Sequence, residues 1–144
     1  MATVTHGVTL ASTSQAASYT TGSFTPAVDD LLIAFAVVTA TAAAGSMSDS
    51  LGGGWTQIIT AVKNASGDKL WCFVRTALST GAALTVTMDV TGDTGTGCVL
   101  FVARVAGLTR TGSDAARQNA VQSNQAASGT PAPAFPGSAL TGIP

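Results

Sequence analysis

The stretch that decides the fold is VDDLLIAFAVVTATAAAGSMSDSLGGGWTQI, residues Val28–Ile58. An acidic pair opens it, a continuous apolar run from Leu31 to Val38 follows, and a glycine-rich corner then leads to Trp55. Such a run, with β-branched and aromatic residues and turn signals at its ends, is typical of a central strand covered on both faces. A strand of this kind needs a second layer over it, so the stretch predicts a two-layer β architecture.

Further apolar or alternating runs on both sides of this stretch predict six more strands, separated by segments rich in glycine and serine. The run ALTVTMDVT alternates most strictly, with Leu84, Val86, Met88 and Val90 expected to point inward. The seven predicted strands are Ala2–Ala11, Ser18–Thr25, Asp30–Thr41, Trp55–Asn64, Asp68–Leu78, Ala83–Thr91 and Cys98–Ala106. Between them, Ala42–Gly54 is predicted as a corner and Asn64–Gly67 as a hairpin loop.

Many short strands joined by such turns predict an all-β fold, an antiparallel two-sheet β-sandwich of jelly-roll-like type, over residues 1–107.

Only 9% of the 144 residues are charged and no glutamate occurs, against about 25% charged residues in an average domain. Because charged residues usually fill exposed helix faces, this composition argues against helices. A surface with so few charges also resists association poorly, which suits a protein of an assembly.

The last part of the chain, residues 108–144, has a different character. It has almost no apolar periodicity and contains four prolines in its last 14 residues, with Phe135, Leu140 and Ile143 as isolated apolar residues. Proline-rich extended segments have a low ordering cost and lie flat on other surfaces. The sequence therefore predicts an extended C-terminal arm, which either wraps its own domain or reaches a neighbouring subunit.

Charge and hydropathy exclude several partners. The six basic residues are spread along the chain without a patch, so we expect no nucleic acid. The most apolar stretch, Leu31–Ala44, is shorter than a membrane span, so we expect no membrane. Residues Met1–Leu10 lack the basic and apolar regions of a signal peptide, so we expect synthesis in the cytoplasm.

No group of residues identifies a chemistry, and we predict a protein that is not an enzyme and has no cofactor. His6 is the only histidine and has no evident catalytic partner, and the usual nucleophile, zinc and phosphate motifs are absent. Cys72 and Cys98 lie in apolar runs and are expected to be buried. No metal site is predicted, although a cation beside Asp89 and Asp93 stays open as an alternative to an ordinary turn.

The aromatic residues admit two interpretations. Alternation places Trp71 and Phe73 on one face of their strand together with Lys69 and Arg75. They fit either the core or an amphipathic interface formed by Trp71, Phe73 and Arg75. Alternatively, Tyr19, Trp55 and Trp71 could form a platform on which a carbohydrate stacks.

Three segments together resemble a known family: SFTPAVDDLLIAFAVV, then the corner SDSLGGGWT, then the strand WCFVRTA. They are similar to β-sandwich proteins encoded in the structural gene clusters of tailed phages and prophages, and the likeness covers residues 22–107. Members of this type are virion components such as capsid decoration proteins, head fibres and tail appendages. Relatives often continue past an SGTP-like stretch into further strands. Either the arm replaces those strands here, or the sequence is a piece of a longer protein.

The resemblance implies a structural protein of the virion, and we expect a capsid decoration protein that stabilises the shell. Its partners would be the major capsid protein or other virion proteins, and we also expect a homo-oligomer. The candidate interface comprises Trp71, Phe73, Arg75, Phe135, Leu140 and Ile143. The alternative function is a carbohydrate-binding or receptor-binding module of a phage tail or fibre, using Tyr19, Trp55 and Trp71.

Overall fold

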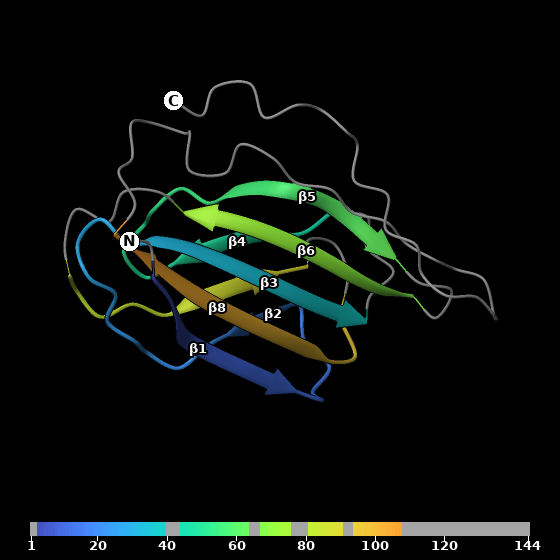
Figure 1. Ribbon diagram of the computed structural model, residues 1–144. Helices are drawn as coiled ribbons and strands as arrows, with labels where there is room; N and C mark the ends of the chain where they lie inside the picture. The colour runs from blue at the N-terminus through green and yellow to red at the C-terminus, as the bar shows by residue number, and fades with distance from the viewer. Residues whose placement is uncertain (1–2, 40–43, 64–66, 76–80, 91–93, 108–144) are drawn as a thin grey trace, which may run out of the picture.

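Two antiparallel β-sheets packed face to face make up the fold (Figure 1). The computed structural model describes residues 3–39, 44–63, 67–75, 81–90 and 94–107, and this part of the chain contains no helix. Its eight strands are β1 (Thr3–Ser12), β2 (Ser18–Thr20), β3 (Leu31–Thr39), β4 (Ser46–Asp49), β5 (Thr56–Lys63), β6 (Asp68–Arg75), β7 (Val86–Asp89) and β8 (Cys98–Ala106).

The larger sheet has the strand order β1-β8-β3-β6-β5 and lies across the front of Figure 1, with the smaller sheet, β2-β7-β4, behind it. An eight-stranded jelly roll has the orders 1-8-3-6 and 2-7-4-5 in its two sheets. Seven strands of the described part keep these places, whereas β5 pairs with β6 in the larger sheet. The prediction of an all-β, jelly-roll-like sandwich is therefore confirmed, and so is the predicted pairing of β5 with β6.

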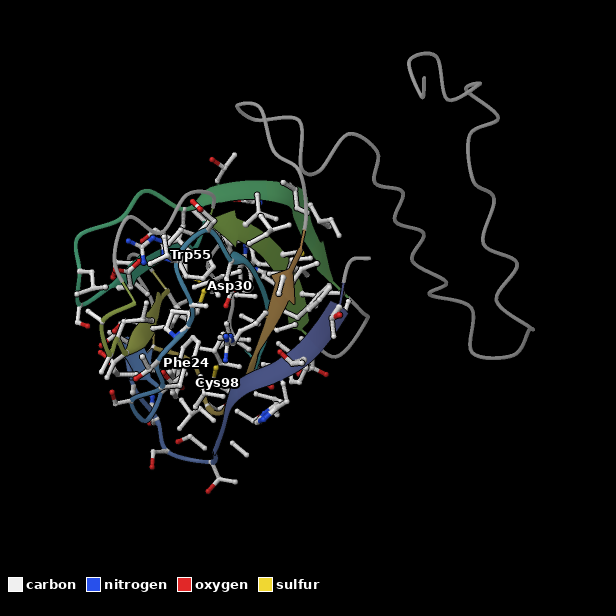
Figure 2. The ribbon with its side chains drawn as sticks, turned by 60° about the vertical axis from the view of Figure 1, so that its left-hand side comes forward. Phe24, Asp30, Trp55 and Cys98 are labelled. Atoms are coloured by element: carbon white, nitrogen blue, oxygen red, sulfur yellow. The ribbon has the colours of Figure 1, made fainter. Side chains whose placement is uncertain are left out.

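The core lies between the sheets and is organised around β3, the middle strand of the larger sheet. The side chains of β3 that face the smaller sheet are fully buried, and so is Trp71 beside them on β6. Phe24 and Trp55 pack against the rim of this core from the loops after β2 and β4 (Figure 2). The four residues expected to point inward from the alternating run ALTVTMDVT are buried as predicted: Leu84, Val86, Met88 and Val90.

The outward-pointing residues of β3 differ from the prediction. The apolar run indicated burial on both faces, and Leu31 is indeed buried at its beginning. Farther along, however, Phe35 and Val37 are 39% and 41% exposed. The smaller sheet covers one face of β3 only, because alternate side chains of a strand point to opposite faces. The expectation that this strand is covered on both faces is thus wrong for its second half.

Two predicted segments also need correction. The corner Ala42–Gly54 contains the strand β4, whose four residues are too few for a visible alternation and include only one large apolar side chain, Met47. The predicted strand Ser18–Thr25 ends at Thr20, and Phe24 makes only an isolated bridge to Leu84. Short strands of this kind are held by tertiary packing, which a local pattern does not report.

Neighbouring valines of β3 provide a test of this orientation. Val38 is fully buried between the sheets, whereas Val37 points outward. We expect Val38→Ala to lower the free energy of unfolding by about 2 kcal/mol, because two buried methyl groups are lost and a cavity remains. Val37→Ala should cost less than half as much. Urea unfolding of the two variants measures the difference, and equal losses would show that both faces are covered.

Candidate functional site

The side of the larger sheet that faces away from the smaller one, here called the outer face, is the most distinctive surface of the molecule. Register brings the outward residues of β8, β3 and β6 into rows, such as Phe101, Phe35 and Cys72 in one row and Val99, Val37 and Leu70 in the next. Along these three strands the outer face is apolar except for Thr39 and Asp68 at one end. A sandwich usually presents polar side chains at such positions.

Four of these residues form the exposed centre of the outer face. Phe35 lies opposite Phe101 and Val37 lies opposite Val99 on the paired strands β3 and β8. Their exposed fractions lie between 36% and 50%, which is high for large apolar side chains in the middle of a sheet. The ring centroid of His6, on β1, lies 5.6 Å from that of Phe101. Contiguous apolar surface of this kind marks an interaction site in soluble proteins.

The basic residues of the same strands point the other way. Lys69 and Arg75 on β6 and Arg104 on β8 pair in register with the inward residues Val38 and Leu32 of β3. Lys69 and Arg75 are buried and Arg104 is half-buried, so their charged groups lie at the two ends of the space between the sheets. The usual arrangement, with charge outside and apolar groups inside, is therefore partly reversed in this sheet.

One of these charges is held by the corner SDSLGGGWT. The carboxylate of Asp49, the last residue of β4, accepts hydrogen bonds from the backbone N–H groups of Leu51 (2.9 Å) and Gly53 (3.4 Å). It also accepts one from the indole Nε1 of Trp55 at 2.7 Å. Arg75 Nη1 lies 3.1 Å from Asp49 Oδ2 and forms an ion pair with it. The two atoms are not aligned for a hydrogen bond. Asp49 therefore links the smaller sheet, the corner and the larger sheet.

Two of the three glycines of this corner have different structural reasons. Gly52 has a φ of +70°, a conformation that side chains disfavour. Gly53 lies against the guanidinium of Arg75, and a Cβ atom on Gly53 would stand 2.0 Å from Arg75 Nε. A side chain at this position would therefore displace the guanidinium of Arg75 from its place beside Asp49.

A second carboxylate holds the beginning of β3. Asp30 is 2% exposed (labelled in Figure 2), and its Oδ2 accepts hydrogen bonds from Arg104 Nε at 2.8 Å and from the backbone N–H of Ala27 at 2.8 Å. Arg104 Nη2 lies 2.7 Å from the same oxygen. Of the acidic pair that opens the strand, Asp30 is therefore committed to anchoring the preceding loop. This role is structural.

The interface predicted on β6 does not lie on the surface of the body. Trp71, Phe73 and Arg75 are 0%, 3% and 7% exposed and face the smaller sheet. Of the two interpretations of this strand, burial therefore supports the core. The basic neighbours suggested an exposed face, but Arg75 reaches Asp49 at the end of the core with its stem among apolar groups.

The predicted carbohydrate platform is not assembled either. Trp71 is fully buried, and Tyr19 is 4% exposed with its hydroxyl within hydrogen-bond distance of the backbone oxygens of Ser14 and Gly95. Trp55 is half-buried and its indole N–H is used by Asp49. A stacking platform needs open aromatic faces, and two of its three predicted members lie inside the sandwich.

Several predicted residues lie outside the described part of the chain. Phe135, Leu140 and Ile143, together with the whole predicted arm, belong to residues 108–144, and Asp93 belongs to residues 91–93. Within the described ranges, no three His, Cys, Asp or Glu side chains are grouped so that they could hold a metal ion. The same ranges contain no helix long and apolar enough to cross a membrane.

The two cysteines are buried, as predicted, and unpaired. Burial raises the pKa of each thiol from 9.0 to about 11, for Cys72 as for Cys98. A thiol with such a pKa is almost fully protonated near neutral pH and is a poor nucleophile. His6 is exposed on the outer face and lies 2.9 Å from the Thr9 hydroxyl through Nε2.

Sequence reasoning missed the outer face and the two anchoring carboxylates. The signal for the outer face was present, since outward and inward positions of β3 are equally apolar and the basic residues of β6 share a face with Trp71. For Asp49, the corner motif was the signal, but its partner Arg75 lies on another sheet.

A scan against family models, curated proteins and solved structures found no match for the chain.

Replacing Asp49 tests whether this carboxylate ties the sheets together. We expect Asp49→Ala to lower the free energy of unfolding by about 3–5 kcal/mol, because Arg75 keeps a buried charge without its partner. Trp55→Phe removes the indole hydrogen bond to the carboxylate and part of the ring that packs against the core, and should cost about 1.5–3 kcal/mol. Chemical denaturation measures both. A loss below 1 kcal/mol for Asp49→Ala would contradict the role assigned to it.

The thiol pKa values give a separate test by chemical labelling. At pH 8 both native cysteines should react with a disulfide reagent about 100-fold more slowly than an exposed thiol introduced by Ala11→Cys. After denaturation, all thiols should react at the ordinary rate. Fast reaction of Cys72 or Cys98 in the native protein would mean that the strands carrying them open readily.

Proposed function

We propose that this protein is a structural component of a phage virion, most specifically a capsid decoration protein, and that it acts by docking and not by catalysis. The observation that carries the proposal is the outer face, an apolar and uncharged surface centred on Phe35, Val37, Val99 and Phe101. A surface of this composition is stable when another surface covers it in an assembly. The virion context comes from the resemblance of residues 22–107.

Docking of this kind fits a shell. The major capsid protein, or another virion protein, would supply the surface on which the body lies, and each copy would add a modest contact. Because a capsid repeats the same site many times, weak contacts that are linked to one another give large avidity. The low charge of the chain, 9% of residues, reduces the desolvation cost of such contacts.

The predicted arm has a place in this proposal. Phe135, Leu140 and Ile143 are apolar residues in an otherwise small and polar segment, so each can act as an anchor on a neighbouring subunit. Linked copies would then stabilise the shell beyond the contact of a single body. The expected homo-oligomer would form through the same arm.

Binding to shells tests the proposal. Phe101→Lys places a charge at the centre of the outer face and should weaken co-sedimentation with shells, assembled from the capsid protein of the same gene cluster, by at least about tenfold. Ser48→Lys is the matched control, since Ser48 is exposed on the side of the smaller sheet that faces away from the core. Equal binding of both variants would reject the outer face as the docking surface, and no binding by the unchanged protein would reject the decoration function.

A further inference from the structure

We infer that two copies of this protein pair through their β1 strands, antiparallel and edge to edge, so that the two larger sheets join into one continuous sheet. The contact concerns the free protein and does not depend on the proposed function. It is made by the described body alone, separately from any contact of the predicted arm.

β1 is an open edge of the larger sheet. Among the described strands it has a neighbour, β8, on one side only, and it forms the lower border of the front sheet in Figure 1. None of its ten residues is buried, and no backbone hydrogen bond from a described loop reaches it. The backbone groups that point away from β8 can therefore pair with a further strand.

The composition of β1 does little to protect this edge. Exposed edge strands are usually short, interrupted by proline or bulges, or marked by charged side chains. β1 (TVTHGVTLAS) is ten residues long and contains neither proline nor Asp, Glu, Lys or Arg. Its Val4 is an apolar side chain that is 69% exposed. A strand paired with β1 would bring a side chain beside Val4 and cover part of it.

The other edges of the described sheets offer less to a partner. β5, at the far side of the larger sheet, shifts its register against β6 at two places. The edges of the smaller sheet, β2 and β4, have only three and four residues. Irregular or very short strands present few backbone groups in register. β1 is therefore the edge best suited to pairing.

The single irregularity of β1 is a β-bulge with Gly7 as the extra residue. The residue before Gly7 pairs with Ala103 and the residue after it pairs with Val102. A Cβ atom on Gly7 would stand 2.8 Å from the backbone oxygen of Val102, so this place favours a glycine. The ten residues of β1 therefore occupy nine positions along β8.

An odd number of positions is what a symmetric pair of full length requires. In two-fold pairing of antiparallel strands, the first residue of one copy lies opposite the last residue of the other, and opposite side chains point to the same face. Thr3 and Ser12 satisfy this, because nine positions place both on one face of the sheet. A regular strand of ten residues would set an inward side chain against an outward one. The length and the bulge of β1 therefore fit a second copy of itself.

This register brings compatible side chains together. Val8 lies at the centre, beside Val8 of the second copy, where it already packs against the core. On the outer face, Val4 lies opposite Ala11 of the second copy, and His6 lies opposite Thr9 of the second copy. Charges of the same sign, which would destabilise the pair, do not face each other. Because the two-fold axis is perpendicular to the sheet, the outer faces of both copies lie on the same side and form one surface.

Sedimentation velocity of the full chain tests the inference. We expect a monomer–dimer equilibrium with a dissociation constant on the order of micromolar, because an edge contact is smaller than the roughly 1,200 Å² of a standard interface. The double substitution Val4→Lys and Ala11→Lys places like charges opposite each other twice in the pair and should raise this constant at least about tenfold. Val4→Glu with Ala11→Glu should have the same effect. An equimolar mixture of the two variants should restore dimers, because the introduced charges then attract.

The matched control is Ser46→Lys with Ser48→Lys, which adds the same charges at exposed positions of β4 and should leave dimers unchanged. A protein that stays monomeric at every soluble concentration would overturn the inference. Dimers that persist in both charged variants would also overturn it, since the contact would then lie elsewhere. A loss that mixing does not restore, or that the control shows equally, has the same consequence.

A disulfide tests the register without added charge. Val4→Cys with Ala11→Cys places thiols opposite each other between copies, whereas roughly 20 Å separates the two positions within one strand. Mild oxidation should yield at least about fivefold more covalent dimer than for Val4→Cys with Thr9→Cys, whose thiols are out of register. Cys72 and Cys98 are buried and do not compete. Equal yields would overturn the inference. All these measurements use the free protein, so their failure is distinguishable from failure to bind shells.

Discussion

The constraint on which this structure depends is the two-residue period of β3. Once Leu32, Ala34, Ala36 and Val38 are buried against the smaller sheet, the alternate residues Ile33, Phe35 and Val37 must point outward. These residues are also apolar, and the sandwich has no third layer among its described strands to cover them. The apolar outer face and the inward charges of Arg75 and Arg104 follow from this register, which no local rearrangement can change without reversing every side chain of the strand.

Most of the fold could be predicted from the sequence, because it depends on local patterns. The strict alternation around Met88 predicted which side chains enter the core, and the run beginning at Leu31 predicted the middle strand. The same run did not show how many faces of the strand are covered. A strand packed on one face and a strand packed on both faces can have the same sequence pattern. Strand β4 was not predicted because its four residues include one large apolar side chain, Met47, and are too few to show a periodicity.

The candidate site was less accessible to sequence reasoning because it depends on contacts between distant segments. The corner SDSLGGGWT could be recognised as distinctive, yet its physical meaning is the carboxylate of Asp49, which connects the backbone of the corner to Trp55 and to Arg75 on the opposite sheet. Trp71 and Phe73 looked amphipathic beside their basic neighbours. Both are buried, and Arg75 shares their face because its charge is paired with Asp49, a contact between distant segments that a local pattern does not report.

The opposed faces of β3 place neighbouring residues under different kinds of natural selection. A change at Ala36 must be compensated within the same fold, because its side chain is fully enclosed by the two sheets. The effect of a change at Val37, one position later, depends on the surface that lies over the outer face. Adjacent positions of a single strand can therefore diversify at different rates.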